Sequence, residues 1–360
     1  MRPADVRVAM DVTPAITGST GVARYTADLR GALGALGVEV AAFAIGRGQR
    51  QAPAATRHIH APLRVVQRAW QFTGRPLAEN LVGPVDVVHS IDLVAPPTRR
   101  PLVVTVHDLV ALELPDLHDD RARRQQEARL IDVARADVVI VPTAATAGSL
   151  ARWGADVERV VVVPHGLPAL GAPVPVSVPD GAVLAVGTLS RRKGLDVLLR
   201  AAAAMRRPAP VVLAGPIGDH AAALRHLIDE LGIGERVMVL GAVDDRTLAG
   251  LYRAALALCF PSRAEGFGLP LLEAMAAGLP VVATDLEVIR EVTDGAAVLT
   301  PPEDHLALAA VLDKVVADGA LRSRLSAAGR LRAASFTWEA AASRTLGAYQ
   351  RAAESARLAP

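Results

Sequence analysis

The chain is poor in cysteine, in aromatic residues and in long apolar runs, and each shortage excludes a class of protein. Its 360 residues include one cysteine, Cys259, so no disulfide framework is available and a reducing compartment is expected. Aromatic residues make up only 3% of the chain, which argues against a nucleic-acid binder that stacks bases on rings. No apolar run reaches the roughly 18 residues that span a bilayer, and residues 1–7 lack the apolar core of a signal peptide. We therefore expect a soluble, cytoplasmic protein.

Lysine is also nearly absent. The formal net charge is +2, and a calculated pI near 9.0 in an arginine-rich chain gives no nucleic-acid signature. Only Lys193 and Lys314 are lysines, against 37 arginines. Where arginine is the usual cation, a lysine beside two arginines indicates either chance or a place that needs a compact point charge, as a diphosphate does.

What the chain does contain is an alternation of short apolar runs with helical patterns. Its length fits two domains of about 150–180 residues, and 51% of its residues are hydrophobic. The strand-like runs are 6–12, 38–43, 85–89, 102–106, 138–141 and 160–163, then 182–187, 211–214, 237–240, 255–260, 281–284 and 297–299. This alternation predicts an α/β protein with two doubly wound parallel sheets, which bind ligands where strands end.

A proline-rich stretch separates the two halves. Residues 167–180 hold four prolines and show no helical period, as expected of a linker. We expect an N-terminal domain, a linker, a C-terminal domain and a terminal helix, with the bounds 1–168, 169–181, 182–336 and 337–360.

The most informative stretch is 262–285, which follows an apolar run. The segment EGFGLP begins at Glu265, and a helix then opens with Pro270 and ends at Gly278. Glycines let the backbone approach a ligand, and a helix N-terminus offers unpaired N–H groups, so the stretch predicts an anion site. Glu265 and Glu273 can each accept hydrogen bonds from hydroxyls. The pattern suits a ligand with a phosphate between two polyols; the alternative is an ordinary loop with solvated glutamates.

These paired glutamates, with EGFGLP and the following EAMA, resemble the motif of the family 4 retaining glycosyltransferases (group 1). The resemblance implies the GT-B fold, in which two Rossmann-like domains face a cleft and a C-terminal helix crosses back to the first domain. It implies that Glu265 and the nearby amides hold the transferred sugar, and that Glu273 holds the ribose. The donor-binding residues that it implies here are Glu265, Gly266, Phe267, Gly268, Leu269 and Glu273.

A basic loop follows the first strand of the second half. Gly187 is followed by TLSRRKG, and family members carry a basic pair here that Arg192 and Lys193 match. In those members the lysine contacts the donor diphosphate. Many of them have an arginine directly after the glycine, where this chain has Thr188, so Arg192 is the candidate to replace that charge.

The first half offers three strand ends with polar groups. The loop 18–21 is no dinucleotide or P-loop fingerprint; in the resembled family a glycine loop here lies against the diphosphate, and Gly21 is the match, although a flexible connection is the alternative. His107 directly follows a strand, where the family keeps a histidine near the reacting sugar; a packed structural histidine is the alternative. His165 is either a hinge contact or a packed residue.

Arginines gather on the predicted helix 121–135. Arg121, Arg123 and Arg124 are followed by Arg129 and Arg135. The pattern predicts either a solvated helix face or contact with an anionic lipid or acceptor.

Together these features predict a hexosyltransferase that uses a nucleotide diphosphate sugar and a glycan, lipid-linked or small-molecule hydroxyl acceptor. His107, Lys193 and Glu265 are the expected catalytic residues. No Asp-x-Asp cluster stands in a suitable context, so neither a metal nor another cofactor is expected. Nucleic acid is not an expected partner. The loop after Gly187 resembles mannosyl- and rhamnosyltransferases, which favours GDP-mannose. Alternatives are a nucleotide-sugar epimerase and a non-enzymatic sugar-binding protein. We expect a cytoplasmic enzyme, with weak peripheral contact to the inner membrane face as the further prediction.

Overall fold

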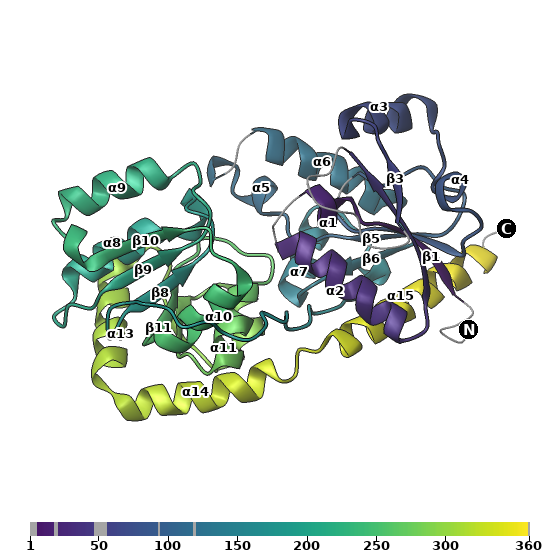
Figure 1. The fold of residues 1–360 in the computed structure, drawn as a ribbon. Helices are drawn as coiled ribbons and strands as arrows, with labels where there is room; N and C mark the ends of the chain where they lie inside the picture. Colours follow the sequence, from purple (N-terminus) through teal and green to yellow (C-terminus); the bar gives the residue numbers. More distant parts are fainter. Residues whose placement is uncertain (1–5, 18–20, 47–55, 93, 118–119, 359–360) are drawn as a thin grey trace. The chain divides into compact units, whose positions relative to one another are not determined.

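The structure is a computed structural model that describes residues 6–17, 21–46, 56–92, 94–117 and 120–358. The chain forms two compact units (Figure 1). Unit 1 comprises Met1–Pro168 and Phe336–Pro360, and unit 2 comprises Ala169–Ser335. Each is described below by itself.

Unit 1 is built on a parallel sheet with the strand order β3-β2-β1-β4-β5-β6-β7. The strands are β1 (Arg7–Asp11), β2 (Glu39–Ile45), β3 (Thr56–Ile59), β4 (Val87–Ser90), β5 (Leu102–Thr105), β6 (Val138–Val141) and β7 (Val160–Val162). Every residue of β4, β5 and β6 is buried, as expected for central parallel strands covered on both faces. The apolar runs of the sequence form this core.

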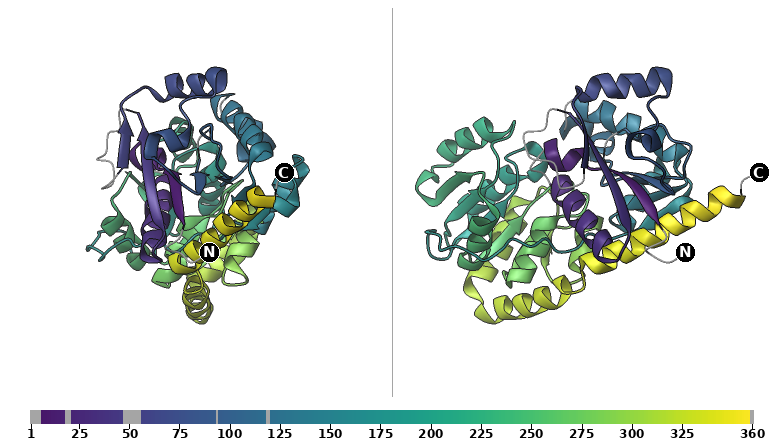
Figure 2. Two further views of the ribbon diagram at one scale, coloured as in Figure 1. Left: turned by 90° about the vertical axis from the view of Figure 1, so that its right-hand side faces the viewer. Right: turned by 45° about the vertical axis from the view of Figure 1, so that its right-hand side comes forward.

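The helices of unit 1 cover this sheet. They are α1 (Thr13–Thr17), α2 (Gly21–Ala35), α3 (Leu63–Thr73), α4 (Ala78–Val82), α5 (Val110–Glu113), α6 (Asp120–Arg135), α7 (Ala144–Arg152) and α15 (Trp338–Leu358). The terminal helix α15 lies along α2 and the central strands, as Figures 1 and 2 show. On α15, Tyr349 is fully buried, and its hydroxyl lies 2.8 Å from Nδ1 of His89 on β4. The end of the chain therefore returns to the first unit.

Unit 2 contains a second parallel sheet, with the order β10-β9-β8-β11-β12-β13. Its strands are β8 (Val183–Val186), β9 (Val211–Ala214), β10 (Val237–Gly241), β11 (Ala257–Phe260), β12 (Val281–Thr284) and β13 (Val298–Thr300). Its helices are α8 (Leu195–Ala204), α9 (Ala221–Glu230), α10 (Asp245–Ala254), α11 (Leu269–Ala277), α12 (Glu287–Thr293), α13 (His305–Ala317) and α14 (Gly319–Ala333). The short 3-10 helix η4 (Arg191–Lys193) precedes α8.

The predicted fold class is confirmed, since two doubly wound parallel sheets are present and α15 packs on unit 1. Strand β3 is absent from the prediction because Thr-Arg-His-Ile has no apolar run; it pairs only with β2, at the edge of the sheet. Residues 169–181 contain neither helix nor strand. No described helix combines the length and the apolar character that crossing a bilayer requires.

Candidate functional site

Two glycines shape the loop that carries Lys193: Gly187 directly follows β8, and Gly194 directly follows η4. Gly187 has φ near +145°, and a Cβ there would lie 2.9 Å from Cε of Lys193, so the lysine stem lies against a bare backbone. Gly194 has φ near +59°, and its Cβ would lie 2.0 Å from the carbonyl oxygen of Pro261. Only glycine fits both the conformation and the space at these positions. The ammonium of Lys193 lies 4.8 Å from the ring centre of Phe260.

Glu265 lies between the two cations of this loop. Nζ of Lys193 donates to its Oε1 at 2.6 Å, and Nη1 of Arg192 lies 3.1 Å from its Oε2. The Glu265 side chain is 7% exposed. Burial would raise the pKa of this carboxyl, but the charges of Lys193 and Arg192 outweigh burial and lower the pKa to about 2. The carboxylate is therefore ionised at neutral pH, and the three charges form a compact, largely desolvated group.

Arg263 fixes the η4 turn that carries these cations. Its guanidinium donates two hydrogen bonds to Asp196, at 2.8 and 2.7 Å, and one to the carbonyl of Arg191 at 2.6 Å. It also donates two to Glu303, at 2.7 and 2.8 Å, and its backbone N–H donates to the carbonyl of Arg192. This planar fork matches two carboxylates and ties three loops together. Sequence reasoning missed Arg263, because its partners lie about 40 and 70 positions away.

Helix α11 begins within the EGFGLP segment, whose last two residues form its first turn. Gly268 has φ near +90°, and a Cβ there would lie 2.8 Å from Cδ1 of Leu271, so the helix entry needs glycine. Helix α11 starts at Leu269 and is capped by Gly278, as its proline and glycine indicated. Gly266 is partly exposed and Phe267 is buried in the loop before it. The loop and the first helical turn bring backbone N–H groups beside Glu265 in sequence, which is a suitable arrangement for an anion.

Glu273 lies about one turn into α11 and is 4% exposed. The hydroxyl of Tyr252, on α10, donates to its Oε2 at 2.8 Å. Tyr252 is itself 1% exposed, so this pair is fixed within unit 2. Tyr252 is a second residue that sequence reasoning missed; the apolar pattern of α10 makes it look like an ordinary core residue.

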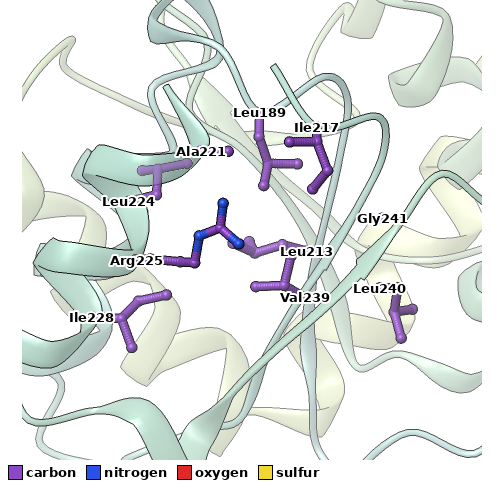
Figure 3. A pocket seen from close by; sticks show the side chains of 10 residues that line it. All are labelled: Leu189, Leu213, Ile217, Ala221, Leu224, Arg225, Ile228, Val239, Leu240 and Gly241. Atoms are coloured by element: carbon purple, nitrogen blue, oxygen red, sulfur yellow. The ribbon is translucent and has the colours of Figure 1, made fainter. Parts of the chain in front are cut away.

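A cavity of about 300 Å³ lies between α9 and the strands β9 and β10 (Figure 3). Its lining is mostly apolar, and Figure 3 shows the Arg225 side chain reaching over it from α9. The residues that line it are Leu189, Leu213, Ile217, Ala221, Leu224, Arg225, Ile228, Val239, Leu240 and Gly241. Beside it, Gly215 backs onto Gly187, where a Cβ would lie 2.0 Å from the Gly187 carbonyl oxygen. The carboxyl ends of β8 and β9 are therefore packed backbone to backbone.

Two predicted site residues lie in unit 1. Gly21 is exposed and begins α2, whereas residues 18–20 of the predicted glycine loop lie outside the described residues. His107 follows β5, and its ring lies edge-on to Tyr25, with 4.9 Å between ring centres. Burial lowers the pKa of His107, so the imidazole is neutral at pH 7. His165 is packed in the same cluster, 4.5 Å from the Tyr25 ring and 6% exposed, which settles its open alternatives in favour of packing.

Arg129 corrects the prediction of a uniformly solvated helix face on α6. It is 6% exposed and lies inside the unit rather than on its surface. Its guanidinium donates to the carbonyl oxygens of Ser90 and Thr105, at 3.0 and 2.9 Å, and to the Ser90 hydroxyl at 3.0 Å. It thereby joins the carboxyl ends of β4 and β5 just before His107. A helical arginine pattern does not distinguish a buried position from exposed ones.

Known families match both halves of the chain. Residues 19–169 match the family described as Glycosyltransferase Family 4, and residues 176–332 match Glycosyl transferases group 1. A D-inositol 3-phosphate glycosyltransferase of Frankia alni is 33% identical over 96% of this chain and 98% of its own length. The chain belongs to the family 4 glycosyltransferases.

Other relatives of this glycosyltransferase match over shorter spans. The D-inositol 3-phosphate glycosyltransferase of Xylanimonas cellulosilytica is 34% identical over 70% of this chain, which spans 66% of that relative's length. The O-antigen chain mannosyltransferase B of Escherichia coli is 28% identical over 73% of this chain and 74% of its own length.

Solved structures share the fold. The sucrose-phosphate synthase of Thermosynechococcus elongatus superimposes with a TM-score of 0.79 at 24% identity, over 96% of this chain and 98% of that one. HepE of Anabaena in complex with UDP-glucose gives a TM-score of 0.64 at 19% identity, over 97% and 99% of the two chains. The GT-B fold, with its two parallel-sheet domains, is therefore shared, at identities that show the fold alone.

In this family 4 glycosyltransferase, unit 2 brings Gly187, Arg192, Lys193 and Glu265 into one cluster, and α11 begins next to it in the chain. Glu273, on the same helix, accepts a hydrogen bond from the Tyr252 hydroxyl. Chemically, the cluster offers two cations, a carboxylate that is ionised at neutral pH, and a helix N-terminus. Such a set can bind an anion with hydroxyls attached.

Proposed function

We propose that this protein is a retaining glycosyltransferase that moves a hexose from a nucleotide diphosphate sugar to a hydroxyl of a glycan, a glycolipid or a small molecule. The observation that carries the proposal is the ion-paired group of Glu265 with Lys193 and Arg192, at 2.6 and 3.1 Å, in which Glu265 and Lys193 are buried and Arg192 is partly exposed. Cations fixed beside a carboxylate at a helix entry are suited to hold a diphosphate and a sugar side by side. The family membership supports the same reaction class.

The charges have distinct roles in this proposal. As the bond from the anomeric carbon to the β-phosphate oxygen breaks, negative charge grows on the diphosphate. Lys193, Arg192 and the Leu269 N–H at the start of α11 are assigned to stabilise that charge, because they are already in position and need no reorganisation. No resident metal is assigned a part in the reaction, and Gly21 is assigned to the same diphosphate from unit 1.

The two glutamates bind opposite ends of the donor. Glu265 accepts hydrogen bonds from the transferred sugar and remains a carboxylate, so it also favours the positive charge that the sugar gains in the transition state. Glu273 accepts hydrogen bonds from the ribose, with Tyr252 fixing its orientation. The half-buried, neutral His107 is assigned a hydrogen bond near the reacting sugar. The acceptor oxygen bonds the anomeric carbon on the face that the diphosphate leaves, and its proton passes to the released diphosphate; this stereochemistry is the family expectation.

For the donor we propose a hexose nucleotide, with mannose favoured. The loop after Gly187 and the mannosyltransferase relative support GDP-mannose. Solved neighbours carry UDP and UDP-glucose, so UDP-hexoses are the competing class. The names of the inositol phosphate relatives make D-inositol 3-phosphate the first soluble acceptor to try.

The test is a screen in two steps. Thermal shift across GDP- and UDP-hexoses identifies the nucleotide, because a ligand that binds only the folded state raises the melting temperature. Release of free nucleotide diphosphate is then measured with and without acceptors. Release that requires an acceptor supports transfer, whereas sugar conversion without any acceptor would make the protein an epimerase instead. The anomeric configuration of the product, read by NMR, tests retention.

We further propose a cytoplasmic location with peripheral contact to the inner membrane face, which would bring the enzyme to a lipid-linked acceptor. On α6, the sequence-based candidate for this contact, Arg121 and Arg124 are exposed. Arg123 lies 4.0 Å from Asp120 and 3.7 Å from Glu127, which reduces the net charge of that face. Helix α6 is therefore a weak candidate for the contact.

A further inference from the structure

One long segment of this chain contains no acidic residue. Residues 40–78 contain six arginines and neither Asp nor Glu, although the whole chain carries only +2, so the remainder sums to −4 (2 − 6). The segment contains strand β3 and helix α3 of unit 1. Segregation of charge on this scale creates a local positive field that the overall balance conceals.

Helix α3 has two apolar sides. On one side, Val66 and Trp70 are 8% and 5% exposed and pack into the core of unit 1. On the other side, Val65 is 60% exposed and Phe72 is 84% exposed, the highest value among the large apolar side chains of the described residues. Seven residues are about two helical turns, so Val65 and Phe72 share one face. Exposed apolar residues that share a face indicate contact with something other than water.

Arginines surround these apolar side chains. Arg64 and Arg68 are exposed on α3, and Arg68 lies three residues from Val65 and four from Phe72, so all three side chains are neighbours. Helix α3 itself contains no acidic residue, and neither Arg64 nor Arg68 has an ion pair within the described residues. Exposed Arg75 follows the helix, and β3, which ends four residues before α3 begins, adds exposed Arg57.

We propose that this face docks unit 1 on a membrane surface that carries anionic lipid. The basic apolar face is defined as Arg57, Arg64, Val65, Arg68, Phe72 and Arg75. Its arginines would pair with lipid phosphates, while Phe72 and Val65 enter the boundary between headgroups and acyl chains. A nucleic acid fits less well, because one exposed ring on this face is no stacking platform. The α6 helix, with its internal ion pairs, is not the docking element.

This inference deepens the proposed function, since it names the surface that would place the enzyme beside a lipid-linked acceptor. The docking measurement itself needs neither donor nor acceptor. Vesicle binding without transfer would therefore contradict the proposed reaction and not the docking face, and transfer to a soluble acceptor without vesicle binding would do the reverse.

The experiment is co-sedimentation of the full chain with vesicles of phosphatidylcholine, alone or mixed with phosphatidylglycerol. The double variant Arg64→Gln/Arg68→Gln should bind the mixed vesicles about 25-fold more weakly, because each arginine contributes about fivefold. Phe72→Ser should lose about tenfold, and that loss should persist at high salt, because it removes apolar burial rather than charge. Matched controls are Arg121→Gln/Arg124→Gln on α6 and Leu331→Ser on α14, where Leu331 is 80% exposed. Both controls should bind like the parent.

Several results would overturn the proposal. They are failure of the parent to bind mixed vesicles, equal loss in the α6 control, and a Phe72→Ser variant that binds normally. Retention of an acidic peptide or an oligonucleotide, with no vesicle binding, would assign the face to another partner. Thermal melts check folding, and the exposed positions of Arg64, Arg68 and Phe72 predict unchanged melting temperatures.

Discussion

Replacing Arg263 with methionine should loosen the turn that carries Lys193 without touching Lys193 itself. The side chains of Arg263 and Asp196 are 18% and 23% exposed, so their two hydrogen bonds are largely shielded from water. A charge-assisted hydrogen bond of this kind contributes about 1.5–3 kcal/mol to stability when it is buried. Because this pair is partly exposed, we assign the two Arg263–Asp196 hydrogen bonds about 2 kcal/mol in total. The Glu303 side chain is 55% exposed, so the ion pair of Arg263 with Glu303 adds little to stability.

The assay has two readouts. Arg263→Met should lower the free energy of unfolding by about 2 kcal/mol and the melting temperature by roughly 4–8 °C. It should also lower kcat by about tenfold to 100-fold, because a displacement of about 1 Å in a charged group is costly in the transition state. Arg263→Lys should recover part of both losses, since lysine restores a charge but not the fork.

The matched control is Arg290→Met. Arg290 also pairs with a carboxylate through two hydrogen bonds, at Asp285, but that pair is exposed and lies outside the η4 turn. Its loss should leave both stability and kcat close to the parent values. If Arg263→Met lost stability but kept its kcat and its affinity for nucleotide diphosphate, the positioning role would be refuted and Arg263 would serve the fold alone.

Three further predictions concern the donor site. Lys193→Ala should cost about 2–4 kcal/mol of transition-state stabilisation, and unchanged diphosphate affinity in calorimetry would contradict the assignment. Burial alone would raise the pKa of Glu265, yet Lys193 and Arg192 lower it from 4.5 to about 2. Ionised Glu265 therefore stabilises the fold by about 3 kcal/mol above pH 4.5, and this stabilisation is lost as the pH falls from 4.5 toward 2. Urea unfolding across that interval should show the loss in the parent and a flatter profile in Glu265→Gln. Tyr252→Phe removes the hydrogen bond that orients Glu273, so it should weaken diphosphate binding several-fold, or about 1 kcal/mol. Equal affinity would show that the hydroxyl has no role in binding.

Much of the fold follows from local pattern. Central parallel strands are buried on both faces, so they read as apolar runs such as β6, and Pro270 with Gly278 marks α11 within a residue of its ends. The sequence pattern does not predict strand β3, because an edge strand does not need a continuous apolar run. Fold class is therefore readable wherever burial dictates the composition.

The supporting contacts of the site do not follow from local pattern. Arg263 meets Asp196 across 67 positions, and Tyr252 meets Glu273 across 21, so only tertiary structure pairs them. Arg129 looks like the solvated arginines around it, yet it is buried, because its guanidinium donates to the carbonyl oxygens of Ser90 and Thr105 at the ends of β4 and β5. Glycine at 187 is readable as a loop signal, but its contact with the lysine stem is not.

The central claim is that Glu265 serves the sugar and Glu273 the ribose of one donor. A nucleotide diphosphate without its sugar still presents the ribose. Glu273→Gln should therefore weaken product binding and donor binding equally, by about 1.5–3 kcal/mol. Glu265→Gln should leave product affinity nearly unchanged and lower turnover instead, because its charge matters more in the transition state.

Calorimetry of nucleotide diphosphate binding, paired with single-turnover rates for both variants, is the most direct test of that claim. The account predicts lost product affinity in Glu273→Gln alone and a lost rate with intact product affinity in Glu265→Gln. The opposite pattern would reverse the two roles. Unchanged affinity and rate in both variants would contradict the account, because the donor would then bind elsewhere.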